Sequence, residues 1–524
     1  MVLALVVALA LPSAAAAAGL RVAGFVGDRP GDAGGAFVGP TAVSVDPGDV
    51  DDPDDDRIYV VEGLPGNNRV QRLDSNGNFE LAWGKDVVAA GAPGDRGREF
   101  EVCRRGASCQ AGRPGSGPGE LRGPVALAAD PDSGDVYVLD GGNRRVSRFS
   151  ASGDPLGSWS VDVGVAANRD LGGAIAVDAT APHDIFVGDP ATDRVLQFTA
   201  EGGLVRGWGR GVDDGGDAFQ VCVEASACRA GGRVAGGGSA PPRWPEHLAV
   251  DRHGVVYGSV FMGTDFESHH TRTRILRFDS DAAPTAGDAG EAWLRALWAR
   301  NDHRPPPLGA PSAVLTNGAT EGIEIDPRDG SLLVFHNPFG TSGLDVVEHP
   351  AGRGGRPRLS LETVGTLPFL QNVSDMAVAE GGKAILLSSG TVRSQFGPSS
   401  FTGCRRASRD ADCHGLVVLA DDGPPRALLT GPPGLGTSAW VDAGGAASYR
   451  LEVSRDGRRW TPVGPERGAL GTTFDPVPLD AATLMAESTP MVEPGLYKLR
   501  VVVAKKTERG LLTVVSGVSA FVAR

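Results

Sequence analysis

Three acidic side chains and one histidine stand where they could bind a cation. Glu246, Glu321 and Asp375 each occupy the second position of a similar short segment, and His247 follows the first of them. Carboxylates that converge bind Ca²⁺ or a cationic group, and their mutual repulsion raises their pKa values. These four residues are the candidate ligand-binding site, with Ca²⁺ as the one cofactor that the pattern suggests. In the alternative interpretation, the carboxylates are solvated or accept hydrogen bonds from neighbouring amides.

The sequence offers little for other kinds of catalysis. Of the nine histidines only His247 lies on such a segment, and no His-Glu-x-x-His or Cys-x-x-Cys element supports a zinc site. There is no Gly-x-Ser-x-Gly nucleophile turn and no phosphate-binding loop. The acidic run Asp49–Asp56 lacks the spacing of an EF-hand, which favours a solvated loop.

Cysteine spacing and the N-terminus both indicate export. An even number of cysteines in short loops of an exported chain favours disulfides, and the gaps within the couples fit a zinc knuckle poorly. The couples are Cys103/Cys109, Cys222/Cys228 and Cys404/Cys413. The apolar run Val2–Leu11 and the alanine tract after it are typical of a signal peptide over residues 1–18, although an uncleaved or lipid-anchored helix is the alternative. We expect a secreted or cell-envelope protein.

The candidate site belongs to a pattern that recurs six times. In each copy an alternating apolar strand mostly ends in an acid, and a second, a third and often a Trp-bearing fourth strand follow. The first strands end at Asp46, Asp130, Asp178, Asp251, Asp326 and Glu380. Four strands per unit, with Gly, Asn and Asp turns, predict the blades of a β-propeller. In the fourth unit, residues 292–298 are the expected fourth strand.

These units resemble NHL repeats, whose core has the form G-I-A-V-D, then I-Y-V-A-D, then N-x-R-I and F. Residues 125–149 (VALAADPDSGDVYVLDGGNRRVSRF) are the clearest match, and the likeness covers about residues 20–431. Two inserts of similar pattern, FEVCRRGASCQAG and FQVCVEASACRAG, resemble the disulfide inserts of secreted bacterial NHL proteins. The resemblance implies six blades around a channel, ligands at one mouth, and the cysteine inserts around that mouth. Either residues 20–27 or residues 426–430 would complete blade six.

Residues that recur from blade to blade are expected to have a structural role within the blade. An arginine opens the third strand in four units, and in three of them an acid closes the second strand. We expect ion pairs within the blade, which stabilise it by an amount that depends on burial. The residues are Arg69, Arg145, Arg194 and Arg274, with Glu62, Asp140 and Asp189.

A second domain is expected after the propeller. Residues 492–501 (VEPGLYKLRV) resemble the strand of fibronectin type III domains that begins with a tyrosine. The fold class is therefore all-β, with a six-bladed propeller at residues 19–431 and a small β-sandwich at 432–524. Gly 76 and Pro 38 also oppose a helical bundle. The net charge of −14 argues against nucleic acid as a partner, and no apolar stretch beyond the N-terminus is long enough for a membrane span.

The expected function is non-enzymatic binding. A secreted scaffold would present the propeller mouth and the disulfide-clamped loops to an extracellular protein or polysaccharide. One alternative is a metal-assisted lyase or hydrolase that uses Glu246, Glu321 and Asp375 around Ca²⁺. A second is a cell-envelope structural protein whose sandwich docks to wall polymer.

Overall fold

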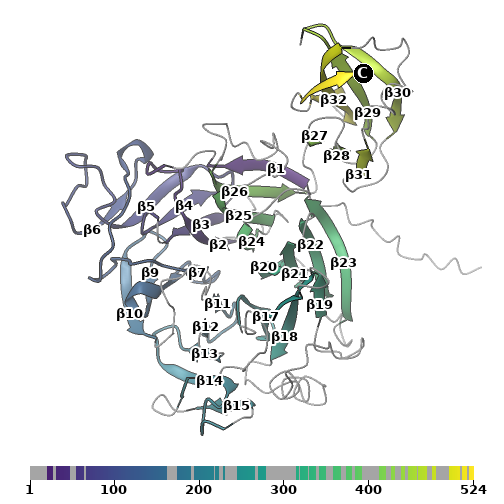
Figure 1. Ribbon diagram of the computed structural model, residues 1–524. Helices are drawn as coiled ribbons and strands as arrows, with labels where there is room; N and C mark the ends of the chain where they lie inside the picture. Colours follow the sequence, from purple (N-terminus) through teal and green to yellow (C-terminus); the bar gives the residue numbers. More distant parts are fainter. Residues whose placement is uncertain are drawn as a thin grey trace, which may run out of the picture.

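The computed structural model is built from β-strands (Figure 1). It describes residues 21–27, 31–47, 55–63, 66–161, 174–189, 194–216, 219–223, 228–230, 245–265, 270–278, 314–317, 319–327, 330–337, 342–349, 358–367, 373–379, 384–391, 412–420, 426–430, 438–442, 447–456, 458–468, 475–478, 495–507, 510–515 and 519–523. Within these ranges there is no α-helix, only two short 3-10 turns, η1 (Gly106–Ser108) and η2 (Gly141–Asn143). No helix in this part of the chain is long and apolar enough to cross a membrane. The expected signal peptide lies outside the described residues.

Six antiparallel sheets follow one another along the chain, and we number them in that order. Sheet one contains β2 (Pro40–Asp46), β3 (Arg57–Glu62), β4 (Arg69–Asp74), β5 (Phe79–Lys85) and β6 (Phe100–Cys103). Sheet two contains β7 (Ala126–Ala129), β8 (Val136–Asp140), β9 (Arg145–Phe149) and β10 (Pro155–Ser160). Sheet three contains β11 (Ala174–Val177), β12 (Ile185–Asp189), β13 (Arg194–Phe198), β14 (Leu204–Arg210) and β15 (Phe219–Cys222).

The other three sheets have four strands each. Sheet four contains β16 (Leu248–Val250), β17 (Val256–Asp265), β18 (His270–Phe278) and β19 (Val314–Asn317). Sheet five contains β20 (Ala319–Ile325), β21 (Leu332–Asn337), β22 (Ser342–His349) and β23 (Arg358–Leu367). Sheet six contains β24 (Val373–Val378), β25 (Ala384–Thr391), β26 (Asp412–Ala420) and β1 (Arg21–Val26).

The first strands of the six sheets contact one another in a closed cycle. β2 contacts β7, and the contacts continue through β11, β16, β20 and β24 back to β2. Figure 1 shows the sheets arranged around a centre, with these strands innermost. Six sheets around a channel are the architecture of a β-propeller, so the all-β propeller expected from the sequence is confirmed.

Blade six is completed from the other end of the chain. β1 pairs antiparallel with β26, from Arg21 opposite Ala420 to Val26 opposite Leu416. The competing segment becomes β27 (Arg426–Thr430), which pairs with β28 instead. This pairing joins the N-terminal strand to the last blade and so holds the ring closed, while β1 itself forms the outer edge of sheet six.

Tryptophans on the fourth strands join neighbouring blades. The buried ring of Trp83 on β5 lies 6.1 Å from Tyr59 of its own blade and 5.7 Å from Phe149 of the next. The same arrangement recurs with Trp159 between Tyr137 and Phe198, and with Trp208 between Phe186 and Phe278. The Trp-bearing fourth strands seen in the sequence are thus a packing repeat between blades.

Sheet four departs from the expected strand order. Its fourth strand is β19, which pairs with β18. Residues 292–298, the strand expected from the Trp pattern, lie outside the described residues.

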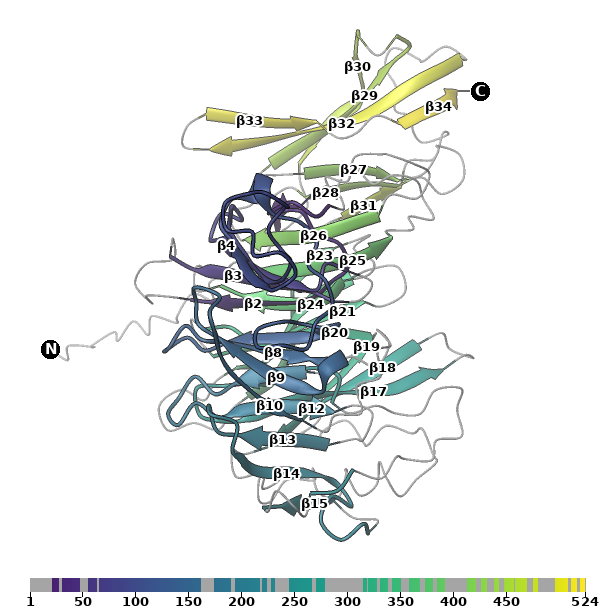
Figure 2. The same cartoon turned by 90° about the vertical axis from the view of Figure 1, so that its left-hand side faces the viewer.

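The C-terminal strands form two further sheets, seen at one end of the molecule in Figure 2. The first contains β27, β28 (Ser438–Asp442) and β31 (Asp475–Pro478). The second contains β30 (Thr461–Gly468), β29 (Ala447–Ser454), β32 (Gly495–Thr507), β33 (Gly510–Val515) and β34 (Ser519–Ala523). β27 thus pairs with the C-terminal strands and not with blade six.

Candidate functional site

Asp375 lies in the channel wall where the ring closes. Its position on β24 faces β2, and its Oδ2 accepts a hydrogen bond of 2.9 Å from the backbone N–H of Val43. The side chain keeps some accessible surface although protein surrounds it. Burial raises its pKa from 3.8 to about 7, against the opposing effect of backbone hydrogen bonds.

Glu324 is a second channel carboxylate, on the neighbouring strand β20. Its Oε1 accepts a hydrogen bond of 3.0 Å from the N–H of Ile325. Burial raises the pKa of Glu324 to about 8, and the negative charge of Asp375 adds to the rise. The strands approach closely here, since a Cβ built on Gly322 of β20 would lie 2.9 Å from Met376 of β24. The structure therefore brings Asp375 together with an acid that the sequence interpretation missed.

The signal for Glu324 was present in the repeat. It occupies the fifth position of its first-strand segment, where the other five copies have small or apolar residues: Ser44, Ala128, Ala176, Ala249 and Val378. A comparison of every position across the copies, instead of the second position alone, would have selected it.

The pair can hold protons or a cation. Near neutral pH Glu324 is mostly protonated and Asp375 is about half protonated, and a protonated carboxyl group can donate a hydrogen bond. A divalent cation that bound both would have to displace these protons, which makes its affinity depend on pH. Among the described residues, no three His, Cys, Asp or Glu side chains come close enough together to hold a metal ion.

The other predicted ligands lie near the start of a blade. Glu246 and His247 precede β16 and are both partly exposed. The backbone N–H of Glu246 donates a hydrogen bond to the carbonyl of Ser259, and that of His247 donates one to the Ser259 hydroxyl. These two bonds hold the segment against β17. The backbone of Glu321 lies on β20, but its side chain is outside the described part of the structure. The convergence of these side chains with Asp375 remains a prediction.

Two of the three expected disulfides are present. Cys103 bonds to Cys109 and Cys222 to Cys228, with Cα–Cα distances of 5.7 and 5.4 Å. Cys413 lies on β26, whereas Cys404 is outside the described residues, so that couple stays a prediction.

The first disulfide insert runs along the outside of blade one. β6 pairs with the outer side of β5, with Cys103 opposite Ala82, and the disulfide loop follows it. From this loop the guanidinium of Arg104 reaches the carbonyl of Ser152, in the turn between β9 and β10. The expectation that the insert rims the channel mouth is therefore wrong for the disulfide loop. The insert starts with a fifth strand, which directs it along the blade's outer edge.

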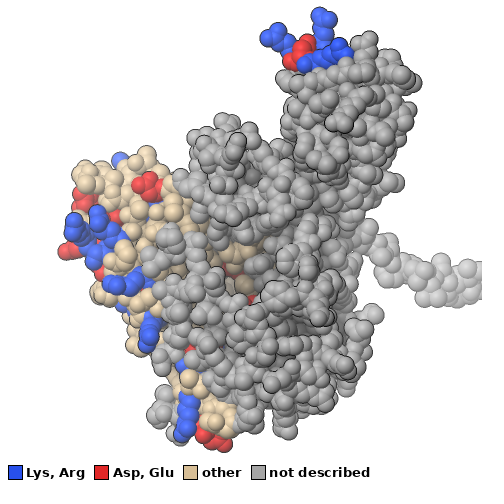
Figure 3. Space-filling model, viewed as in Figure 1, with Lys and Arg blue, Asp and Glu red and all other residues tan. Residues whose placement is uncertain are grey.

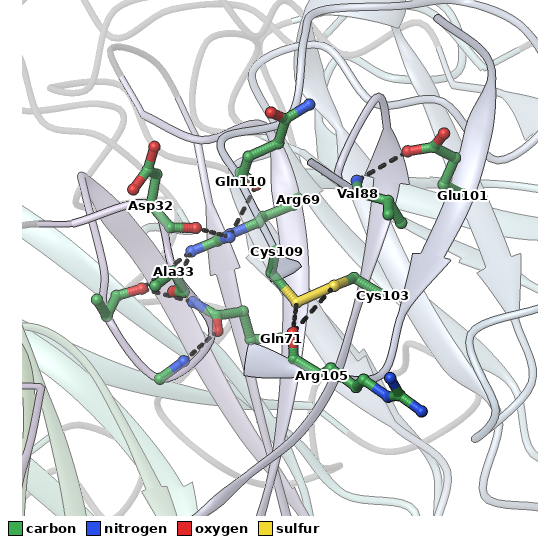
Figure 4. Close-up of a disulfide and its surroundings, with 12 residues drawn as sticks. Asp32, Ala33, Arg69, Gln71, Val88, Glu101, Cys103, Arg105, Cys109 and Gln110 are labelled. Atoms are coloured by element: carbon green, nitrogen blue, oxygen red, sulfur yellow. Dashed lines mark hydrogen bonds between the residues drawn. A yellow bond between two sulfur atoms is a disulfide. The ribbon is translucent and has the colours of Figure 1, made fainter. Parts of the chain in front are cut away.

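Buried groups hold this insert in place (Figure 4). The fully buried Arg69 pairs with Glu62 at 2.7 Å, and its Nη1 donates to the carbonyl of Gln110, next to the disulfide, at 2.9 Å. Glu101 of β6 accepts from the N–H of Val88 at 2.8 Å. The carbonyl of Arg105 lies 3.3 and 3.6 Å from the two sulfurs, as a close contact, because a disulfide has no proton to donate.

The arginine at the same position of blades two and three anchors a segment between blades. Arg194 lies 3.5 Å from Asp189 and donates to the carbonyl of Arg229, next to the second disulfide. Arg145 pairs with Asp140 at 3.0 Å and donates to the carbonyl of Ser116 in the segment that enters blade two. The expected ion pairs are present in these three blades, and each also anchors an inter-blade segment.

No protein-family model and no curated protein matches this sequence. Among solved structures, a streptogramin B lyase structure is similar at 9% identity and a TM-score of 0.36, covering 77% of this chain and 98% of that one. Virginiamycin B lyase from Staphylococcus aureus is similar at 10% identity and 0.28, covering 67% and 82%. The calcium-binding protein regucalcin from Agrobacterium tumefaciens is similar at 11% and 0.30, covering 76% and 95%. The blade number of this chain follows from its own strand pairing.

Proposed function

We propose that the protein is a secreted, non-enzymatic binding protein with an NHL-like propeller and a C-terminal fibronectin type III-like sandwich. Its disulfide-clamped inserts bind an extracellular protein or polysaccharide, and the tip of the first insert is exposed. The observation that supports this proposal is the contrast between the base and the tip of the first insert. The base is held by buried Arg69, Glu101 and a disulfide, whereas the tip residues Arg104 and Arg105 are exposed.

Preorganised loops favour binding because the cost of ordering them is met by folding. A loop that served the blade alone would need the buried base and not an exposed, charged tip. The disulfides Cys103–Cys109 and Cys222–Cys228 also agree with an oxidising environment, which supports secretion.

The test compares two matched variants on purified extracellular polysaccharides and proteins. In one, glycine and serine replace residues 104–108 while Cys103 and Cys109 are kept. In the other, the same replacement is made at 223–227. Surface plasmon resonance should show that at least one of these changes abolishes ligand binding without lowering the melting temperature. Ligand binding that both variants retain, or an assay in which the wild type shortens a bound polymer, would refute the proposal.

The channel carboxylates favour a second candidate function, which is that of a metal-assisted lyase or hydrolase. Glu324 and Asp375 are two deep, adjacent acids that could provide oxygen ligands for Ca²⁺. Calorimetric titration with Ca²⁺ at pH 8.5 should then show stoichiometric binding by the wild type and none by the Glu324→Gln/Asp375→Asn variant. Equal heats for the two proteins would eliminate this candidate.

A further inference from the structure

The segment from Asp86 to Arg122, which contains the first insert, exposes an excess of positive charge in a protein whose net charge is −14. Between Asp86 and Arg122, six arginines are exposed while only two acids are. Figure 3 shows Lys and Arg side chains gathered on the flank of the molecule where Figure 1 places β6. The exposed arginines are Arg96, Arg98, Arg104, Arg105, Arg113 and Arg122.

Four of these arginines flank β6, and we call Arg96, Arg98, Arg104 and Arg105 the arginine strip. Two precede the strand and two follow it, so β6 lies between the two arginine pairs. No described residue forms an ion pair with Arg96, Arg98 or Arg105, and Arg104 contacts only the carbonyl of Ser152.

The second insert shows that the blade does not need these arginines. It has the same Phe-x-Val-Cys strand, the same disulfide spacing and the same arginine clamp at its base. Its polar residue Gln220 accepts from the N–H of Asp213, as Glu101 accepts from that of Val88. At the four positions aligned with the strip, however, it has Gly215, Asp217, Val223 and Glu224.

The surroundings of the strip favour a polyanion over a protein or membrane surface. In the described part of the chain, the only exposed large hydrophobic side chains are Leu156 and Val223. The strip therefore has no aromatic platform for bases, no apolar anchor for a bilayer and no hydrophobic centre of the kind that protein interfaces use. Guanidinium groups bind carboxylate and sulfate in a bidentate manner, and a row of them suits a chain of such groups.

We propose that the arginine strip binds an acidic extracellular polysaccharide, along the outer edge of blade one. The proposal rests on the binding function proposed above and specifies its partner. The strip is held rigidly by the disulfide and by Glu101, whose Oε1 accepts from the N–H of Arg96 at 2.5 Å. A rigid row loses less conformational entropy when a polymer binds.

The experiment measures binding to heparin and to polygalacturonate, with dextran as the neutral control, by surface plasmon resonance. The Arg104→Val/Arg105→Glu variant gives the first tip the residues of the second, in a loop that already closes around the same disulfide spacing. Its matched control, Arg252→Val/Arg458→Glu, makes the same charge change at two exposed arginines elsewhere. The strip variant should lose at least tenfold in affinity for one of the acidic polymers and show a weaker salt dependence, while the control should retain wild-type binding.

Several results would overturn the proposal. They are equal losses in both variants, equal binding to dextran, or binding to polyglutamate with none to either acidic polysaccharide, which would indicate an acidic protein partner. If the arginines only guard the free edge of β6, the strip variant should self-associate in gel filtration and keep its affinity. If another ligand binds through residues 104–108 without salt dependence, the proposed binding function is retained and the acidic polysaccharide is refuted as its partner. If no ligand depends on either insert, both the proposed binding function and the polysaccharide partner are refuted.

Discussion

Replacing Glu324 by glutamine should stabilise the protein at alkaline pH and leave it unchanged at acidic pH. Because the folded pKa of Glu324 is about 8 against an ordinary 4.5, the folded protein holds a proton that the unfolded chain has already lost. The stabilising effect of this proton is complete below about pH 4.5 and disappears as the pH rises through 8. At about 1.36 kcal/mol per pH unit, ionisation costs at most about 5 kcal/mol, and water in the channel lowers that figure.

Thermal unfolding between pH 5 and 9 measures the effect. With an unfolding entropy of about 2.1 cal/mol/K per residue, a propeller of about 400 residues changes its Tm by roughly 1 °C per kcal/mol. Glu324→Gln should therefore melt up to about 5 °C higher than the wild type at pH 8.5 and only about 1 °C higher at pH 5. Asp375→Asn is the companion variant: its amide oxygen can still accept from Val43, and its gain should begin about one pH unit lower. Parallel Tm profiles for wild type and Glu324→Gln over this range would refute the reasoning.

Three further outcomes can be measured. Arg69→Ala should lower the free energy of unfolding in urea by about 3–5 kcal/mol, because it leaves the buried carboxylate partner unpaired; a loss under 1 kcal/mol would show that water or another group replaces it. Gly153→Ala should lower the Tm, because Gly153 has a φ of +83° and a Cβ there would lie 3.0 Å from the Trp83 ring; an unchanged Tm would contradict the close fit between these blades. Peptide mapping without reduction should recover Cys404 linked to Cys413, and a free thiol at either position would disprove that disulfide.

Repetition made much of the fold predictable from sequence. The alternating strands and the Trp-bearing fourth strands each recur, so a propeller follows from counting them. The path of the first insert was not predictable in this way. Phe100–Cys103 looks like part of a loop between blades, and only its pairing with β5 shows that it is a fifth strand. The fourth strand of blade four was misplaced for a related reason, since a long segment separates β18 from β19 and a Trp within it resembles the repeat.

The channel pair shows a second limit. Asp375 was selected together with Glu246 and Glu321 as an acid at the second position of its segment, whereas the acid at the fifth position of the neighbouring copy was missed. Strands β20 and β24 are the first strands of consecutive blades, so the predicted ring already places them side by side, but the strand pattern does not show how deeply the two carboxyl groups are buried. Single-sequence reasoning thus identified one residue of the pair and missed the environment that raises both pKa values.

The charge of Asp375 exceeds what the blade framework requires. Its carboxylate joins blade six to blade one by accepting from Val43, and at the next joint the hydroxyl of Ser44 accepts from the N–H of Ala129 at 3.1 Å. A neutral oxygen is therefore sufficient to connect neighbouring inner strands. An ionisable group buried at the closure, beside Glu324, lowers the stability of the protein at neutral and alkaline pH because it must ionise there. A hydroxyl group at the same place would not ionise and would have no such cost. The same reasoning applies to the arginine strip, whose four positions are filled without arginine in the second insert. In a repeat protein, an equivalent position in another blade can show that a neutral residue is sufficient for the structure. A charged residue at such a position is therefore the first candidate for a test of ligand binding.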